Sequence, residues 1–172
     1  MNETTYIIIF RLLHIICGVF WAGSVFYVVL FVFPAIKNSE LEGTKFIQQL
    51  AKTGYPIAAA ITGIVTIVSG LFLIWKFSNG FERIWFTAAS SKVLCLGMIA
   101  SIIAFVIGFT FNRPAAGRIN RIDKAIAQGN RPSEQQLQQV TKLKKRIFVA
   151  TTFVAVLLAI AVITMAIFRY VS

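Results

Sequence analysis

Residues 147–168, with the sequence IFVATTFVAVLLAIAVITMAIF, contain no charged side chain. A helix needs about 20 mostly apolar residues to cross the hydrocarbon core of a bilayer, so this stretch is long enough to span a membrane. Three further apolar stretches precede it in the chain: Tyr6–Ile36, Pro56–Phe77 and Trp85–Phe111. We therefore predict an all-α fold, an integral membrane four-helix bundle formed by a single membrane domain over residues 1–172.

The composition favours this fold class over a soluble one. Of the 172 residues, 58% are hydrophobic and 13% are charged, whereas soluble domains are about 45–50% apolar and about 25% charged. The 17 Lys and Arg outnumber the 6 Asp and Glu, but they lie between the apolar stretches rather than in a basic domain. The lipid bilayer is therefore an expected partner and nucleic acid is not.

The distribution of basic residues predicts the orientation in the membrane. The first connection carries three lysines, and the third connection, residues 113–146, carries nine Lys and Arg. The second connection has only Lys76 and Arg83. By the positive-inside rule, the first and third connections are cytoplasmic, and both termini lie outside.

The third connection is predicted to be helical. Isoleucines recur at helical spacing over residues 119–126, and Gly129 with Pro132 supplies a stop. Ser133 and Gln136 match a capping box, after which apolar residues continue at helical spacing into the fourth stretch. We therefore expect a cytoplasmic helical extension between helices 3 and 4, with the fourth helix emerging from the membrane.

Two further signals predict helix starts. Ser39 with Glu42 repeats the capping pattern in the first connection, and Pro56 suits the first turn of the second helix. Within that helix Thr62, Thr66 and Ser69 recur at helical spacing, with two glycines at 63 and 70 on an adjoining stripe. Such hydroxyls and glycines are typical of helix contacts, so this stripe is predicted to pack against a neighbouring helix.

Four basic residues lie within or at the ends of the predicted spans: Arg11, His14, Lys92 and Arg169. Ionisable residues inside a span are costly, which makes them candidates for a functional site. With the termini outside, all four belong to the outer leaflet. The helical face of Arg11 and His14 continues at Gly18, Trp21 and Val25, so this face is expected to point into the bundle.

A haem b site fits this arrangement. An imidazole near the membrane surface can ligate haem iron, and cationic side chains can neutralise the two propionates. We predict His14 as the iron ligand, and as further cofactor-binding residues Arg11, Lys92, Arg169, Gly18 and Trp21. Because the chain has one histidine, the haem would be five-coordinate, take a different sixth ligand, or be shared across a dimer. Snorkelling of the basic side chains, with His14 bonded to a neighbouring helix, is the alternative.

A second candidate site uses sulfur. Imidazole, thiolate and thioether ligands suit Cu(I), and the candidate ligands are His14, Cys17, Cys95 and Met98, with Met165 as a further one. Cysteine and methionine are also ordinary packing residues of membrane helices, so a structural role is the alternative. All six Asp and Glu lie outside the spans, which argues against a carboxylate-based antiporter. No catalytic residue is assigned.

Residues 11–27, RLLHIICGVFWAGSVFY, resemble the first helix of a superfamily of small membrane proteins. This superfamily includes the copper-resistance-protein-D-like proteins and the HemJ-type protoporphyrinogen oxidases. Lys92 looks like the lysine that the HemJ-type proteins carry near the start of their third span. The Asn112-Arg113-Pro114 sequence and the closing residues 165–170, MAIFRY, are similar to the copper-resistance-D-like branch.

The resemblance implies a haem b site at His14 with Arg11 and Lys92 beside it, or the handling of copper. The Asn-Glu-x-Pro and terminal Lys-Pro-Phe features of the HemJ-type enzymes are not found, so their activity is not carried over. We expect a redox protein of a bacterial-type cytoplasmic membrane, working in quinone-linked electron transfer or in small-oxidant or porphyrin chemistry. Copper transport, or a cofactor-free subunit that docks a partner membrane protein, are the alternatives, and a homo-oligomer is compatible with each.

Overall fold

The computed structural model describes residues 2–38, 49–50, 53–127 and 133–171, and these residues are predominantly helical. Helix α1 (Glu3–Tyr27) continues through a π-helical segment, η1 (Val28–Val32), into α2 (Phe33–Asn38). Helix α4 (Tyr55–Phe77) packs along α1, and the ion pair between Lys76 Nζ and Glu3 Oε1, 2.8 Å long, joins the end of α4 to the start of α1. The two helices are therefore antiparallel.

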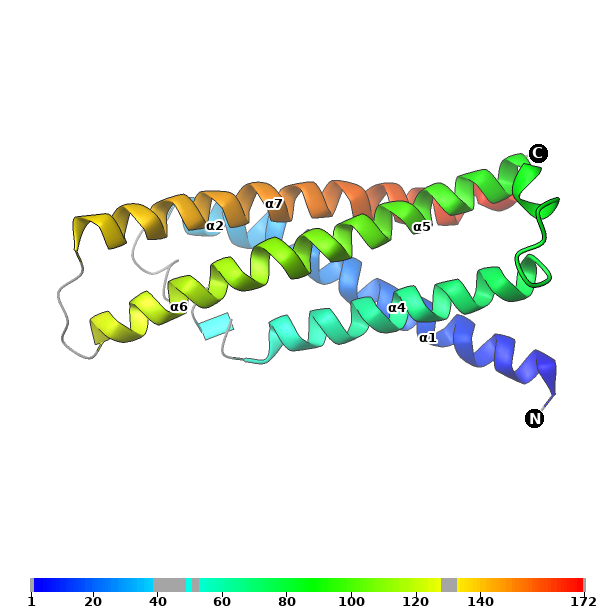
Figure 1. The fold of residues 1–172 in the computed structure, drawn as a ribbon, viewed down its shortest axis with the longest axis horizontal. Helices are drawn as coiled ribbons and strands as arrows, with labels where there is room; N and C mark the ends of the chain where they lie inside the picture. Colours follow the sequence, from blue (N-terminus) through cyan, green and yellow to red (C-terminus); the bar gives the residue numbers. More distant parts are fainter. Residues whose placement is uncertain (1, 39–48, 51–52, 128–132, 172) are drawn as a thin grey trace.

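The second half of the chain repeats this hairpin arrangement. A 3₁₀ turn, η2 (Trp85–Thr87), precedes α5 (Ala89–Ile107), and a second π-helical segment, η3 (Gly108–Asn112), joins α5 to α6 (Arg113–Ala127). Helix α7 (Glu134–Ile167) then packs along α5 and ends in a 3₁₀ turn, η4 (Phe168–Tyr170). Figure 1 shows both termini at one end of the bundle and α6, with the first turns of α7, at the opposite end.

Among the residues that the structure describes, four helical stretches are long and apolar enough to cross a membrane: Glu3–Ile36, Tyr55–Phe77, Ala89–Ile119 and Glu134–Tyr170. This confirms the all-α fold and the number of candidate spans. The predicted third span was wrong at its start, since Trp85 lies in the 3₁₀ turn and Ala88 is extended, with φ −65° and ψ 143°. An extended residue supplies the N-cap that a helix needs, so α5 begins only at Ala89 although the apolar sequence begins earlier.

The fourth helix confirms its predicted start. The Ser133 side chain accepts a hydrogen bond from the Gln136 backbone N–H, and the Gln136 side chain accepts one from the Ser133 backbone N–H. This reciprocal pair satisfies two amide groups at the helix end. Pro56 stands in the first turn of α4, as expected. The predicted stop at Gly129 and Pro132 and the cap at Ser39 and Glu42 lie outside the described residues.

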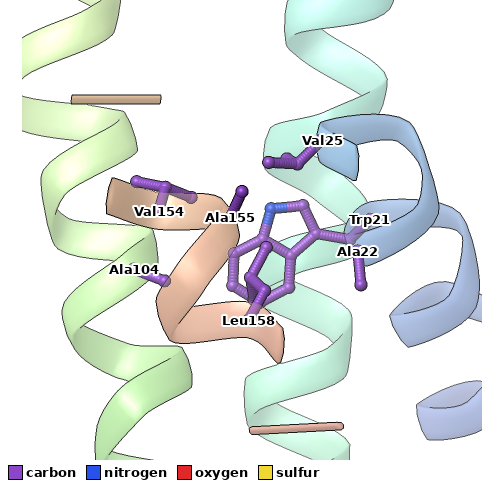
Figure 2. Close-up of a cluster of buried hydrophobic side chains, with 7 residues drawn as sticks. All are labelled: Trp21, Ala22, Val25, Ala104, Val154, Ala155 and Leu158. Carbon is purple, nitrogen blue, oxygen red and sulfur yellow. The ribbon is translucent and has the colours of Figure 1, made fainter. Parts of the chain in front are cut away.

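The centre of the bundle is a small cluster of buried side chains from α1, α5 and α7: Trp21, Ala22, Val25, Ala104, Val154, Ala155 and Leu158. Figure 2 shows the Trp21 indole projecting from α1 toward Leu158 and Ala155 of α7. Small residues let the helix backbones approach, and the indole fills the remaining space.

The outward surface is apolar along the helices. Ile16 and Val19 of α1 keep 65% and 69% of their surface exposed, and similar side chains stand out from α4, α5 and α7. An apolar surface this extensive is unusual for a soluble monomer. It is compatible with a lipid bilayer as the partner of these four helices.

Substituting Gly97 by valine is expected to separate α5 from α7. A Cβ at Gly97 would collide with the Thr164 hydroxyl and lie 3.3 Å from the Ala161 carbonyl oxygen. Overpacking of this kind costs about 1–3 kcal/mol. Thermal unfolding in detergent measures the loss, with Gly23→Val as the control because a Cβ at Gly23 meets nothing within 4 Å. Equal stability of the two variants would contradict this close contact.

Candidate functional site

A cavity lies between α1, α4, α5 and α7, in the half of the bundle that contains the chain termini. Its volume is about 510 Å³, within the range of about 300–1,000 Å³ that is typical of ligand and cofactor pockets. Many of the residues predicted from the sequence line it: Arg11, His14, Gly18, Trp21, Met98, Met165 and Arg169. The predicted inward face of α1 therefore does meet a cavity.

The His14 imidazole is held by α4. Its Nδ1 lies 2.8 Å from the Thr66 carbonyl oxygen, and since a carbonyl only accepts, Nδ1 carries the proton and donates. Ser69 Oγ lies 3.4 Å from the same nitrogen and itself donates to the Val65 and Thr66 carbonyls. This tautomer leaves Nε2 with a free lone pair. Histidines that bind metals are usually oriented in this way, by donation from the other ring nitrogen.

Gly70 makes this placement of His14 feasible. A Cβ on Gly70 would lie 2.9 Å from Cε1 of the imidazole, closer than real Cβ contacts, and 3.1 Å from Nδ1, which is tighter than most of them. One turn further along α1, a Cβ on Gly18 would contact the Thr66 side chain at ordinary distances, 3.4 Å from its methyl group and 3.9 Å from its hydroxyl. The ring therefore lies in close contact with the α4 backbone, where a larger residue would push it away.

Trp21 of α1 is accommodated by a second glycine of α4, Gly63. A Cβ on Gly63 would lie 3.2 Å from the Trp21 ring and 2.9 Å from Phe105, whose ring meets the indole edge-on at 6.0 Å between centroids. His14 and Trp21 are seven residues apart on α1, as Gly63 and Gly70 are on α4. The predicted packing role of the α4 stripe is thus observed, and it positions two residues of the candidate site.

The charges of the cavity are all positive. Arg11 and Arg169 are both exposed and both line the cavity, from the third turn of α1 and from η4. The Arg169 guanidinium lies 5.7 Å from the centroid of the Phe168 ring. Among the residues that the structure describes, no Asp or Glu lines this cavity. An anionic group bound here would find two cations at one end and mostly apolar walls elsewhere.

Three predicted residues are not brought to the cavity. Lys92 is exposed in the first turn of α5, while Cys17 and Cys95 are half-buried free cysteines outside the lining. Of the predicted copper ligands, only His14, Met98 and Met165 face the same space. Within the described ranges no group of three or more His, Cys, Asp or Glu side chains is placed to hold a metal ion.

The role of Thr66 and Gly70 toward His14 was missed in the sequence. The equal spacing of two glycines on one helix and of two rings on another was the signal that could have found it. However, the same spacing also fits many registers of two antiparallel helices. Only the observed register puts Gly70 against the imidazole and Gly63 against the indole.

The fold and the cavity define a class of protein: an all-helical chain with four helices long enough to cross a membrane, and one anchored histidine in a cationic, largely apolar cavity between them. Comparison with protein-family models, with curated proteins and with solved structures finds no match for this chain.

Proposed function

We propose that the protein is a haem b-binding integral membrane protein with a redox function, and that the haem occupies the cavity beside His14. The observation that carries this proposal is the hydrogen bond from His14 Nδ1 to the Thr66 carbonyl, which fixes the ring and leaves Nε2 available. His14 would be the iron ligand. Bound haem would supply one-electron redox chemistry that no amino-acid side chain of the cavity offers.

The other residues of the cavity suit the remaining parts of a haem. Arg11 and Arg169 offer guanidinium groups for the two propionates, which would otherwise be charged next to lipid. Gly18 and Trp21 are part of the wall, where Gly18 leaves room close to the backbone and the indole closes the deep end. Lys92, which does not line the cavity, is left out of this proposed site.

The charge distribution supports an orientation. Arg118, Arg121, Lys142, Lys145 and Arg146 lie on α6 and the first turns of α7, the end of the bundle opposite to the termini (Figure 1). By the positive-inside rule this end is cytoplasmic, and the haem cavity belongs to the outer leaflet of a bacterial-type cytoplasmic membrane. A membrane quinone is the proposed electron partner, because it reaches such a site through the lipid.

Copper is the second candidate, and one observation favours it. His14, Met98 and Met165 line the same cavity, and imidazole with two thioethers is a ligand set that suits Cu(I). This set differs from the one predicted from the sequence, because neither cysteine contributes. A copper ion bound by these ligands would leave Arg11 and Arg169 without a role. Haem is therefore the stronger proposal.

The absorption spectrum of the protein purified from haem-replete cells in mild detergent tests the proposal, with iron and copper measured on the same sample. We expect a Soret band, sharpened α and β bands after dithionite, and one iron per chain, or one per two chains if a dimer shares the haem. A colourless, iron-free protein would overturn it. Copper in stoichiometric amount that is lost in Met98→Leu but kept in Cys95→Ser would establish the second candidate instead.

A further inference from the structure

A second cavity lies on the other side of Trp21 from the His14 cavity. Its volume is about 260 Å³, and it belongs to the half of the bundle that leads to α6. Its walls are mostly aromatic and aliphatic, with three polar side chains, Tyr55, Asn112 and Thr151. Trp21 lines both cavities, so that its indole forms a partition between them.

Both π-helical segments border this second cavity. Val28 and Val32 of η1 face it from one side, and Gly108 and Asn112 of η3 face it from another. Segments of π-helix are rare, and they occur mostly as single turns at functional sites, because the extra residue widens the helix and re-aims side chains. Two such segments around one small cavity indicate a built site rather than a packing defect.

Asn112 lines this cavity and carries a side-chain acceptor without a partner in the described part of the chain. Its Nδ2 donates to Thr151 Oγ1 over 3.1 Å, which joins η3 to α7 at this cavity. Its Oδ1 is buried and accepts no hydrogen bond within the described part of the chain. A buried carbonyl-type oxygen without a donor is costly. A ligand hydroxyl would remove this cost if it met Oδ1 as the amide turned toward the cavity.

We propose that the second cavity binds the ring of a hydroquinone, a quinol, whose hydroxyl donates to Asn112 Oδ1. The walls suit a flat aromatic ring, since Trp21, Phe33 and Phe105 contribute to them. The volume suits one substituted ring and not a larger cofactor. The choice of a quinol among hydroxyl-bearing aromatics rests on the proposed redox function, but the binding itself requires no haem.

Equilibrium dialysis of the protein in lipid nanodiscs tests this site, with tetramethylhydroquinone as the probe under argon and empty nanodiscs subtracted. We expect one saturable site per chain. The dimethyl ether keeps the same ring, loses both donors and adds one methyl group at each oxygen, so it should bind about tenfold more weakly. Equal affinity of the hydroquinone and its ether, or the absence of a saturable site, would overturn the proposal.

Variants assign the site to Asn112 and separate it from the haem. Asn112→Leu should remove the preference for the hydroquinone over its ether, whereas Thr110→Val, in the same segment but bonded only to Val106, should keep it. An Asn112→Leu protein that keeps the preference would refute the assignment. His14→Ala should leave hydroquinone binding unchanged, so a protein that lacks haem but binds hydroquinone fails only the haem proposal.

Discussion

His14→Gly is expected to abolish the Soret band and the stoichiometric iron of the purified protein. The chain has one histidine, and its ring is anchored to the Thr66 carbonyl at the edge of a cavity large enough for a cofactor. Loss of the proposed iron ligand inside a largely apolar cavity would leave only the proposed propionate contacts to hold the haem. We expect the bound fraction to fall at least tenfold, as measured by the reduced-minus-oxidised spectrum per mole of protein.

Two controls distinguish loss of the ligand from loss of the fold. Cys17→Ser changes a residue on the next turn of α1 that lies outside the cavity, and it should keep the full spectrum. Free imidazole should restore the Soret band of His14→Gly, because it can occupy the space that the side chain leaves. An unchanged spectrum in His14→Gly would exclude His14 as the ligand, whatever its position in the cavity.

Gly70→Val is expected to have a similar effect without touching the ligand itself. The Cβ alone would lie 2.9 Å from the His14 ring, and the two methyl groups of valine add to this overlap. The imidazole must then leave the Thr66 carbonyl, so that neither its tautomer nor its direction is fixed. We expect haem content to fall several-fold, and the Soret maximum of the remaining haem to shift.

Gly23→Val is the matched control for Gly70→Val. It places the same side chain on α1 at a position where a Cβ meets nothing within 4 Å, and it should retain both the spectrum and the stability. Helix content by circular dichroism and the elution volume in detergent check that Gly70→Val still folds. Full haem content in a folded Gly70→Val protein would show that the contact between α4 and His14 does not orient the ligand.

The fold could be predicted from the sequence to a large extent. The number of long apolar helices and the reach of α7 from Glu134 to Ile167 follow from hydropathy and from the Ser133–Gln136 capping box. The start of α5 was less predictable, because an apolar sequence continues through a 3₁₀ turn without a change in composition. The π-helical segments left no signal in the periodicity over their five residues each.

The residues that α1 contributes to the candidate site were predicted from the sequence, whereas the role of α4 was not. Arg11, His14, Gly18 and Trp21 share a face of α1 by spacing alone, and they do line one cavity. Lys92 was grouped with them because it enters from the same side of the membrane. The depth of a residue in the bilayer does not specify its direction around the helix axis, and the structure leaves Lys92 exposed on α5.

The sequence by itself determined which segments are helical and apolar and which face of α1 can carry a ligand, because hydropathy, caps and helical spacing are local properties. Only the tertiary structure decided that Thr66 and Gly70 hold the His14 ring, and that Trp21 separates two cavities. These contacts join residues that are far apart in the sequence; His14 and Thr66, for example, are 52 positions apart. They depend on the register and rotation of α1 against α4, which small residues and close packing fix only when the two helices meet.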